Sequence, residues 1–161
     1  MTWGQAFRRQ EVSDYQVFRQ FSATGSDMPV CHRLHFLQMA TEKLAKSFLI
    51  GTSTETPKKS HFALVRFLRV VSSSPDIRDR FKFGNNPKQF KAYIDSLIPL
   101  AEQIESLVPV GGDIERLNPE YPWLNGQQEV MCPADYDFPE FTKSDLVRFA
   151  KFIDSFLSVT A

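Results

Sequence analysis

The chain has 161 residues, of which 42% are hydrophobic and 24% charged, a composition typical of one globular domain. We therefore expect a single domain over residues 1–161 whose core needs no metal, cofactor or disulfide, because a chain of this length buries roughly 70% of its unfolded surface. No apolar run approaches the ~20 residues of a membrane span, and the first residues do not resemble a secretory signal. Two cysteines, Cys31 and Cys132, exclude a disulfide scaffold and favour a cytoplasmic protein.

Charge is balanced overall but unevenly distributed. The 19 Lys and Arg residues match 19 Asp and Glu residues. Residues 58–91 carry nine basic and two acidic side chains, a balance of +7, whereas residues 92–161 carry four basic and twelve acidic ones, a balance of −8. The basic segment favours attraction of phosphate-bearing ligands. The alternative is that the two segments neutralise each other within one fold or across a dimer.

The first half of the chain is predicted to be helical, because its apolar residues recur at a spacing close to 3.6. One helix is expected over residues 5–21 and a second over residues 29–50, with proline near its start and glycine just past its end. Ser60 is a candidate N-cap for a third helix that ends near Val71.

The next segment is also predicted to be helical. A short turn is expected over residues 76–83, and a fourth helix over residues 87–108. Pro99 should kink this fourth helix, because its ring clashes with the carbonyl of Asp95.

The last third of the chain is predicted to consist of an irregular segment followed by a final helix. Residues 109–141 are rich in proline and aromatic rings, which predicts a long ordered loop packed on the helices. Thr142 and Asp145 stand in capping-box spacing and open a last helix to about residue 157. The predicted fold class is all-α, an up-and-down bundle of four to five helices with no sheet, and the 15 Phe residues predict a core of large rings.

The second helix carries the most informative pattern. At about 100° per residue, its apolar residues form one stripe, and Gln38, Glu42 and Lys46 lie with Cys31 and His35 on the neighbouring flank. A polar flank beside a buried face is typical of helices that line a ligand groove. The alternative is that Glu42 and Lys46 form an ordinary i,i+4 ion pair on a solvated face.

Histidines and cysteines do not predict a metal site. Cys31, His32 and His35 are close in sequence, but a structural zinc site needs four ligands, and no C-x-x-C pair is present. Surface or partly buried histidines are the simpler interpretation.

The third helix carries a candidate anion site. Lys59, Arg66 and Arg69 are predicted to project together, and the two arginines, three residues apart, could bind a phosphate by paired hydrogen bonds. A solvated basic ridge is the alternative. His61 falls on the apolar side near the start of this predicted helix, where a structural role is the simpler interpretation.

Three separated segments together resemble the HEPN superfamily. Residues 37–49, with Gln38, the Glu42–Lys43 pair and Lys46, resemble its second-helix signature. Ser60-His61 with Leu64 and Leu68 resembles its His-initiated third helix. Tyr121-Pro122, followed by a helix over residues 143–157, is similar to its Tyr-Pro loop and last helix.

The resemblance implies a four- or five-helix bundle that is often dimeric. The family includes nucleotide-binding proteins, partners of minimal nucleotidyltransferases, and metal-independent RNases of toxin and defence systems. Those RNases use an Arg and a His separated by four to six residues, and no Arg stands at that spacing before any of the three histidines here.

We therefore expect a non-catalytic HEPN-like protein that binds a nucleotide or a nucleic-acid phosphate, or a protein partner such as a nucleotidyltransferase. The alternatives are an RNase that uses His35 or His61 in an atypical arrangement, and a structural dimerisation module. The candidate ligand-binding residues come from the second helix, the third-helix segment and the Tyr-Pro loop: Gln38, Glu42, Lys43, Lys46, His61, Arg66, Arg69 and Tyr121.

Overall fold

The computed structural model describes residues 1–23, 27–51, 53, 61–108 and 114–160. Within these ranges the chain forms seven α-helices, a short 3-10 helix and two strands of two residues each. The all-α prediction is confirmed as a helical bundle, with more and shorter helices than expected. The prediction of no sheet is wrong only for the small pairing of β1 (Trp123–Leu124) with β2 (Val130–Met131), which is antiparallel.

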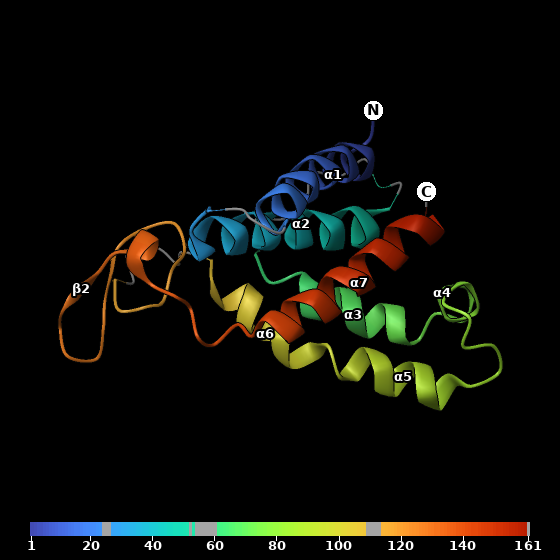
Figure 1. Cartoon of the computed structure of the whole chain (residues 1–161). Coiled ribbons are helices and arrows are strands. Elements are labelled where there is room, and N and C mark those ends of the chain that lie inside the picture. Colours follow the sequence, from blue (N-terminus) through green and yellow to red (C-terminus); the bar gives the residue numbers. More distant parts are fainter. Residues whose placement is uncertain (24–26, 52, 54–60, 109–113, 161) are drawn as a thin grey trace.

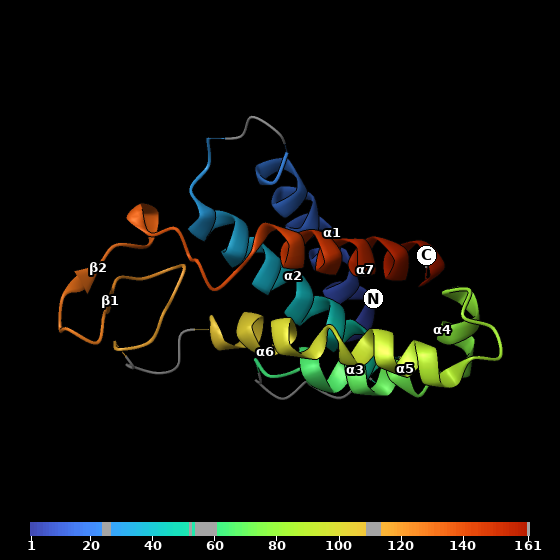
Figure 2. The same ribbon diagram turned by 60° about the horizontal axis from the view of Figure 1, so that its bottom comes forward.

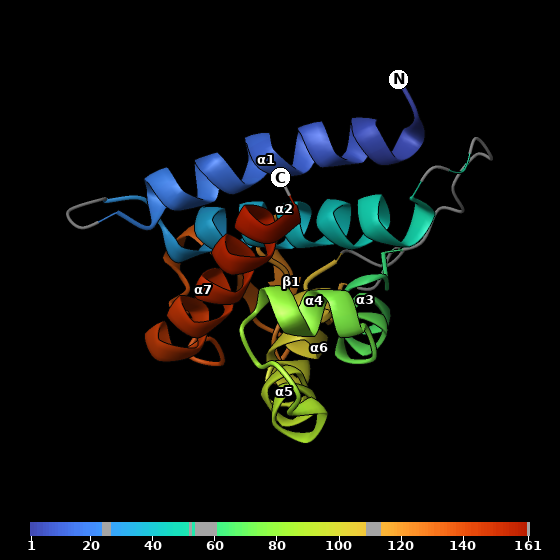
Figure 3. The same ribbon diagram turned by 90° about the vertical axis from the view of Figure 1, so that its right-hand side faces the viewer.

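Helices α1 (Trp3–Phe21) and α2 (Val30–Ile50) form an antiparallel pair that makes one layer of the bundle. Figure 3 shows this pair stacked above the remaining helices. The two helices approach closely at one end, because a Cβ atom added to Gly4 would lie 2.3 Å from the carbonyl oxygen of Gly51. Only glycine fits at residue 4 without a backbone shift.

Of the other helices, α3 (Leu64–Ser72) and α6 (Ile98–Ser106) lie against α2, and α7 (Lys143–Thr160) meets it where Phe156 contacts Phe48 (Figures 1 and 2). Helices α4 (Pro75–Arg80) and α5 (Pro87–Asp95) pack against α3. The expected single helix over residues 87–108 is wrong, because the chain ends α5 at Asp95 and restarts as α6 at Ile98. Pro99 falls in the first turn of α6, where its missing N–H costs no hydrogen bond.

The start of α3 also differs from the prediction. The helix begins at Leu64, and Ser60, the expected N-cap, lies outside the described residues. A carboxylate from α6 takes over the capping role, since Oε1 of Glu105 accepts hydrogen bonds from the amides of Leu64 and Val65. A tertiary contact therefore decides where the helix starts.

The start of α7 agrees with the capping prediction. The hydroxyl of Thr142 accepts a bond from the amide of Asp145 at 3.2 Å and donates one to its carboxylate at 2.6 Å. The long segment before α7 is ordered over residues 114–141, and rings from it pack together: Trp123 lies 5.2 Å from Tyr136 and 5.9 Å from Phe138, centroid to centroid.

Aromatic rings dominate the core, as the composition predicts. The largest completely buried side chains include six phenylalanines, and Phe67 of α3 meets Phe156 of α7 edge to face at 5.0 Å. Phe48 of α2 contacts both rings, so this cluster joins α2, α3 and α7.

Candidate functional site

The polar flank of α2 is built around the carboxylate of Glu42. Nζ of Lys46 donates to Oε1, and Nε2 of Gln38 donates to Oε2 at 3.1 Å. Nδ1 of His61, which precedes α3, lies 2.9 Å from the same Oε2 atom. The structure thus brings together four of the residues predicted from the sequence, and it joins α2 to the segment that leads into α3.

Glu42 is held in its ionised form. Its side chain is 15% exposed, and this burial raises the pKa of the carboxyl. The hydrogen bonds and charges of Lys46 and His61 outweigh burial and leave the pKa below its ordinary value. The expected i,i+4 pair of Glu42 and Lys46 is therefore present, as part of a larger network and not on a fully solvated face.

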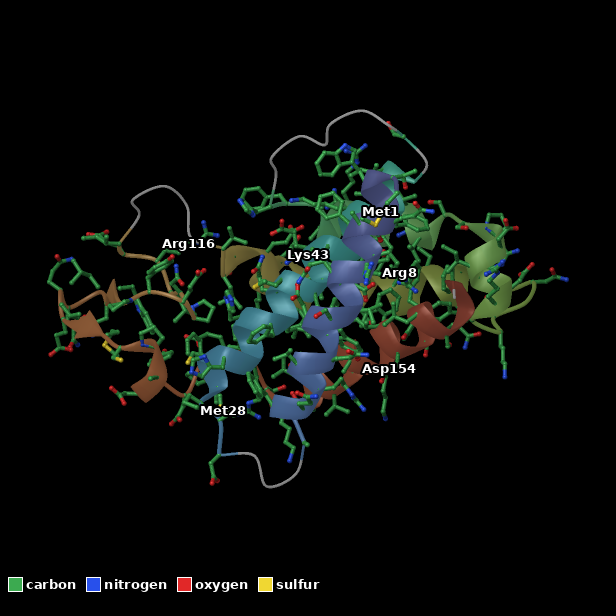
Figure 4. All side chains as sticks on the ribbon, turned by 90° about the horizontal axis from the view of Figure 1, so that it is seen from above. Met1, Arg8, Met28, Lys43, Arg116 and Asp154 are labelled. Carbon is green, nitrogen blue, oxygen red and sulfur yellow. The ribbon has the colours of Figure 1, made fainter. Side chains whose placement is uncertain are left out.

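Lys43 belongs to a different contact. Its ammonium group lies 2.8 Å from Oδ2 of Asp14, a buried residue of α1. Figure 4 shows Lys43 at the seam between α1 and α2. Lys43 thus stabilises the packing of these two helices, and its charge is committed to Asp14.

The Glu42 network has no internal cavity. Gln38, Glu42 and His61 fill the space above Ile104 and Glu105, and the volume left there is about 0 Å³. Burial raises the pKa of Glu105, while the bonds that it accepts from the α3 amides oppose this shift. Within the described part of the chain, a ligand can reach this network from its outer surface, where the His61 side chain is exposed.

His61 corrects one prediction. It lies before α3 and its side chain is 55% exposed, so it is not on the apolar face of the helix. The reason is the late start of α3, which leaves residues 61–63 non-helical and lets the imidazole reach Glu42.

Arg66 and Arg69 are exposed on α3, as predicted. No ion pair within the described part of the chain engages either guanidinium group. Lys59, expected beside them, lies outside the described residues. Phe62 lies two residues before the helix and is 56% exposed.

Tyr121 is not part of the Glu42 network in any contact of the described residues. Its side chain is 55% exposed, and its amide donates to Oδ1 of Asn118 at 3.1 Å. The same loop approaches α2 at His35, whose Nδ1 lies 3.8 Å from a carboxylate oxygen of Glu120.

Sequence reasoning missed Asp14 and Glu105, the two buried carboxylates that position the predicted residues. Both stand on helices other than α2 and α3, and an acidic residue on a helix gives no signal of burial by itself. Only the tertiary packing places Asp14 beside Lys43 and Glu105 beneath α3.

Comparison of the chain with protein families, with curated proteins and with solved structures finds no match. Over the ranges described, no three His, Cys, Asp or Glu side chains gather as a metal site would require. None of the described helices has both the length and the hydrophobicity that crossing a membrane demands.

Proposed function

We propose that the protein binds a phosphate-bearing nucleotide or nucleic acid on the outer face of α3 without cleaving it. The observation that supports this function is that some of the predicted cations are paired with carboxylates and others are not. Lys43 and Lys46 are committed to carboxylates, whereas Arg66 and Arg69 are exposed and have no ion-pair partner in the described structure. Two guanidinium groups three residues apart lie on one helix face and suit bidentate phosphate binding.

The exposed ring of Phe62 favours a ligand that carries a base. Single-stranded nucleic acids bind to surfaces on which cations follow the backbone and aromatic rings stack on the bases. Phe62 stands four residues before Arg66, and His61 beside it is oriented by Glu42. In this proposal Arg66 and Arg69 bind phosphate, and the Gln38–Glu42–Lys46–His61 network holds the adjoining surface in place.

The HEPN resemblance extends the proposal to assembly. In this proposal the chain forms a homodimer in the cytoplasm and binds a nucleotidyltransferase as a partner. Light scattering on the purified chain tests the first statement, since a homodimer has twice the 18.5 kDa mass of one chain.

Fluorescence anisotropy with a short labelled single-stranded RNA at low salt tests binding by α3. Replacing Arg66 and Arg69 together by alanine should weaken binding by at least about a hundred-fold, since each hydrogen bond to a charged group contributes about 1.5–3 kcal/mol and at least two are lost. The matched control replaces Lys88 and Lys91, two exposed lysines of α5, and removes the same charge. Equal losses in both variants would contradict a site on α3.

One observation favours a second candidate function, metal-independent RNA cleavage. The contact between Nδ1 of His61 and Glu42 orients the imidazole, so that its other nitrogen could take the proton of a 2′-hydroxyl while Arg66 stabilises the phosphate charge. Incubating the protein and the His61→Ala variant with single-stranded RNA and a chelator decides between the two functions. Cleavage that is lost in the variant would establish the enzyme, and intact RNA supports the non-catalytic proposal.

A further inference from the structure

A second charged region lies on a different side of the bundle, where the end of α1, the start of α2 and the first half of α7 enclose a pocket of about 300 Å³. Four basic residues and one acidic residue line it, and none of them is a residue singled out from the sequence. The basic residues come from all three helices: Arg19, Arg33, Lys143 and Lys151.

The acidic residue, Asp154, is already engaged. Its Oδ1 accepts a hydrogen bond from the hydroxyl of Tyr15 at 2.8 Å, and its Oδ2 lies 3.6 Å from Nη1 of Arg19. Figure 4 shows Asp154 where α7 passes beside α1. Arg33, Lys143 and Lys151 have no carboxylate partner in the described part of the chain, so the pocket has an excess of positive charge.

The side chain of Arg33 is partly buried. Its Nε atom is buried and makes no hydrogen bond within the described structure. The buried Nε is closed to solvent and therefore to a ligand, but the other N–H groups of the partly exposed Arg33 side chain can donate to an anion in the pocket. A guanidinium group favours anions with oxygens in a plane or fork, phosphate above all.

Two of these cations also stand near the N-termini of their helices, where a positive charge is unfavourable unless an anion is bound. Arg33 lies close to the start of α2, and Lys143 is the first residue of α7. The start of a helix carries the positive end of its dipole, where cations are disfavoured and anions are stabilised. An anion in the pocket would be attracted by the side chains and by both helix dipoles.

The remaining walls of the pocket are apolar, with Phe18 of α1 and Leu146 and Ala150 of α7. A bare inorganic ion would leave these walls without contact. A volume of about 300 Å³ lies at the small end of organic ligand sites, which fits one phosphoryl group joined to a single ring and is too small for a longer oligonucleotide.

We propose that this pocket binds a small organic phosphate, with Arg33 and Lys151 on the phosphoryl group and Phe18 and Leu146 against its organic part. The site is separate from the α3 face and does not depend on the function proposed for it.

Isothermal titration calorimetry at low ionic strength tests the site with two probes, inorganic phosphate and phenyl phosphate. Phenyl phosphate should bind more tightly than inorganic phosphate, because only phenyl phosphate contacts the apolar walls. The Arg33→Met variant should weaken phenyl phosphate binding at least about tenfold, and Lys151→Met, at an exposed position that tolerates substitution, several-fold. The matched control, Lys88→Met at an exposed position of α5, lies outside both proposed sites and should leave phenyl phosphate binding within about twofold.

Three results would overturn the proposal: no binding to the unaltered protein up to about 10 mM, unchanged binding in both pocket variants, or an equal loss in the Lys88→Met control. Thermal melting without ligand gives an independent readout. Arg33→Met should melt at or above the temperature of the unaltered protein, because it removes a buried unpaired donor. A clear fall in melting temperature would show that Arg33 serves the fold and would also overturn the proposal.

Discussion

Glu42 and His61 lie nineteen residues apart in the chain, and their side chains meet at 2.9 Å between Oε2 and Nδ1. This contact fixes the segment before α3 to the middle of α2. Lys46 donates to the other oxygen of the same carboxylate. Replacing Glu42 by a neutral residue would therefore remove the carboxylate partner of both Lys46 and His61.

We expect the Glu42→Gln variant to be less stable at neutral pH by about 1–3 kcal/mol, the cost typical of breaking bonds to a charged group. The folded-state pKa of Glu42 lies below its ordinary value of 4.5, so its contribution to stability is present above that value and is lost as the pH falls through the folded-state pKa. Urea denaturation at neutral pH and near pH 3 measures this difference. If the difference in free energy of unfolding between the two proteins is as large near pH 3 as at neutral pH, the stabilising role of the ionised Glu42 is contradicted.

The contribution of Glu11 to stability should depend on pH in the opposite sense. Its buried position raises the pKa to about 7, although Arg8 opposes the shift. An acid whose pKa is raised in the folded state stabilises the fold below its unfolded value of 4.5, and this contribution is lost as the pH rises toward 7. The Glu11→Gln variant should therefore match the unaltered protein in acid and exceed its stability by about 1–3 kcal/mol at neutral pH. Equal stabilities at every pH would refute the shift.

Replacing Glu105 by alanine should destabilise the protein by about 1.5–3 kcal/mol, since two amides at the start of α3 would lose a charged acceptor. The matched control is Glu102→Ala, because Glu102 is an exposed acid on the same helix and should change stability by less than about 0.5 kcal/mol. Chemical denaturation of both variants measures the difference. Similar effects from the two would show that α3 needs no cap from α6.

Replacing Gly4 by alanine should separate the ends of α1 and α2, because the new methyl group would meet the carbonyl oxygen of Gly51 at 2.3 Å. We expect a loss of about 1–3 kcal/mol, typical of overpacking. Gly126→Ala serves as the control, since a Cβ there meets nothing within 4 Å. Melting temperatures that fall equally in both variants would argue against the close approach.

Much of the helical architecture could be predicted from the sequence because local signals define it. The apolar period of 3.6 marks α1 and α2, and Thr142 marks the start of α7 by a bond to a residue three positions away. The start of α3 could not be predicted in this way, because its cap is a carboxylate forty-one residues further along the chain. Pro99 was recognised as a disruption, but periodicity alone could not distinguish a kink from two helices.

In the candidate site, too, local contacts could be predicted from the sequence and contacts between helices could not. Gln38, Glu42 and Lys46 share one stripe of a helix, so spacing alone places them together, and the structure confirms their contacts. Asp14 contacts Lys43 of another helix, and the cations that line a pocket with Arg33 come from α1 and α7, so only packing determines these neighbours. The pocket beside Arg33 has no sequence signature for this reason, since its four cations come from three separate helices.

The salt dependence of RNA binding tests the central claim most directly. Each phosphate contact on a single strand contributes about 0.7 to the slope of log affinity against log salt concentration. The Arg66→Ala, Arg69→Ala double variant should therefore bind more weakly and with a slope smaller in magnitude by about 1.4, while the Lys88, Lys91 control should retain the slope of the unaltered protein. Identical slopes for the α3 variant and the unaltered protein would contradict phosphate binding by α3.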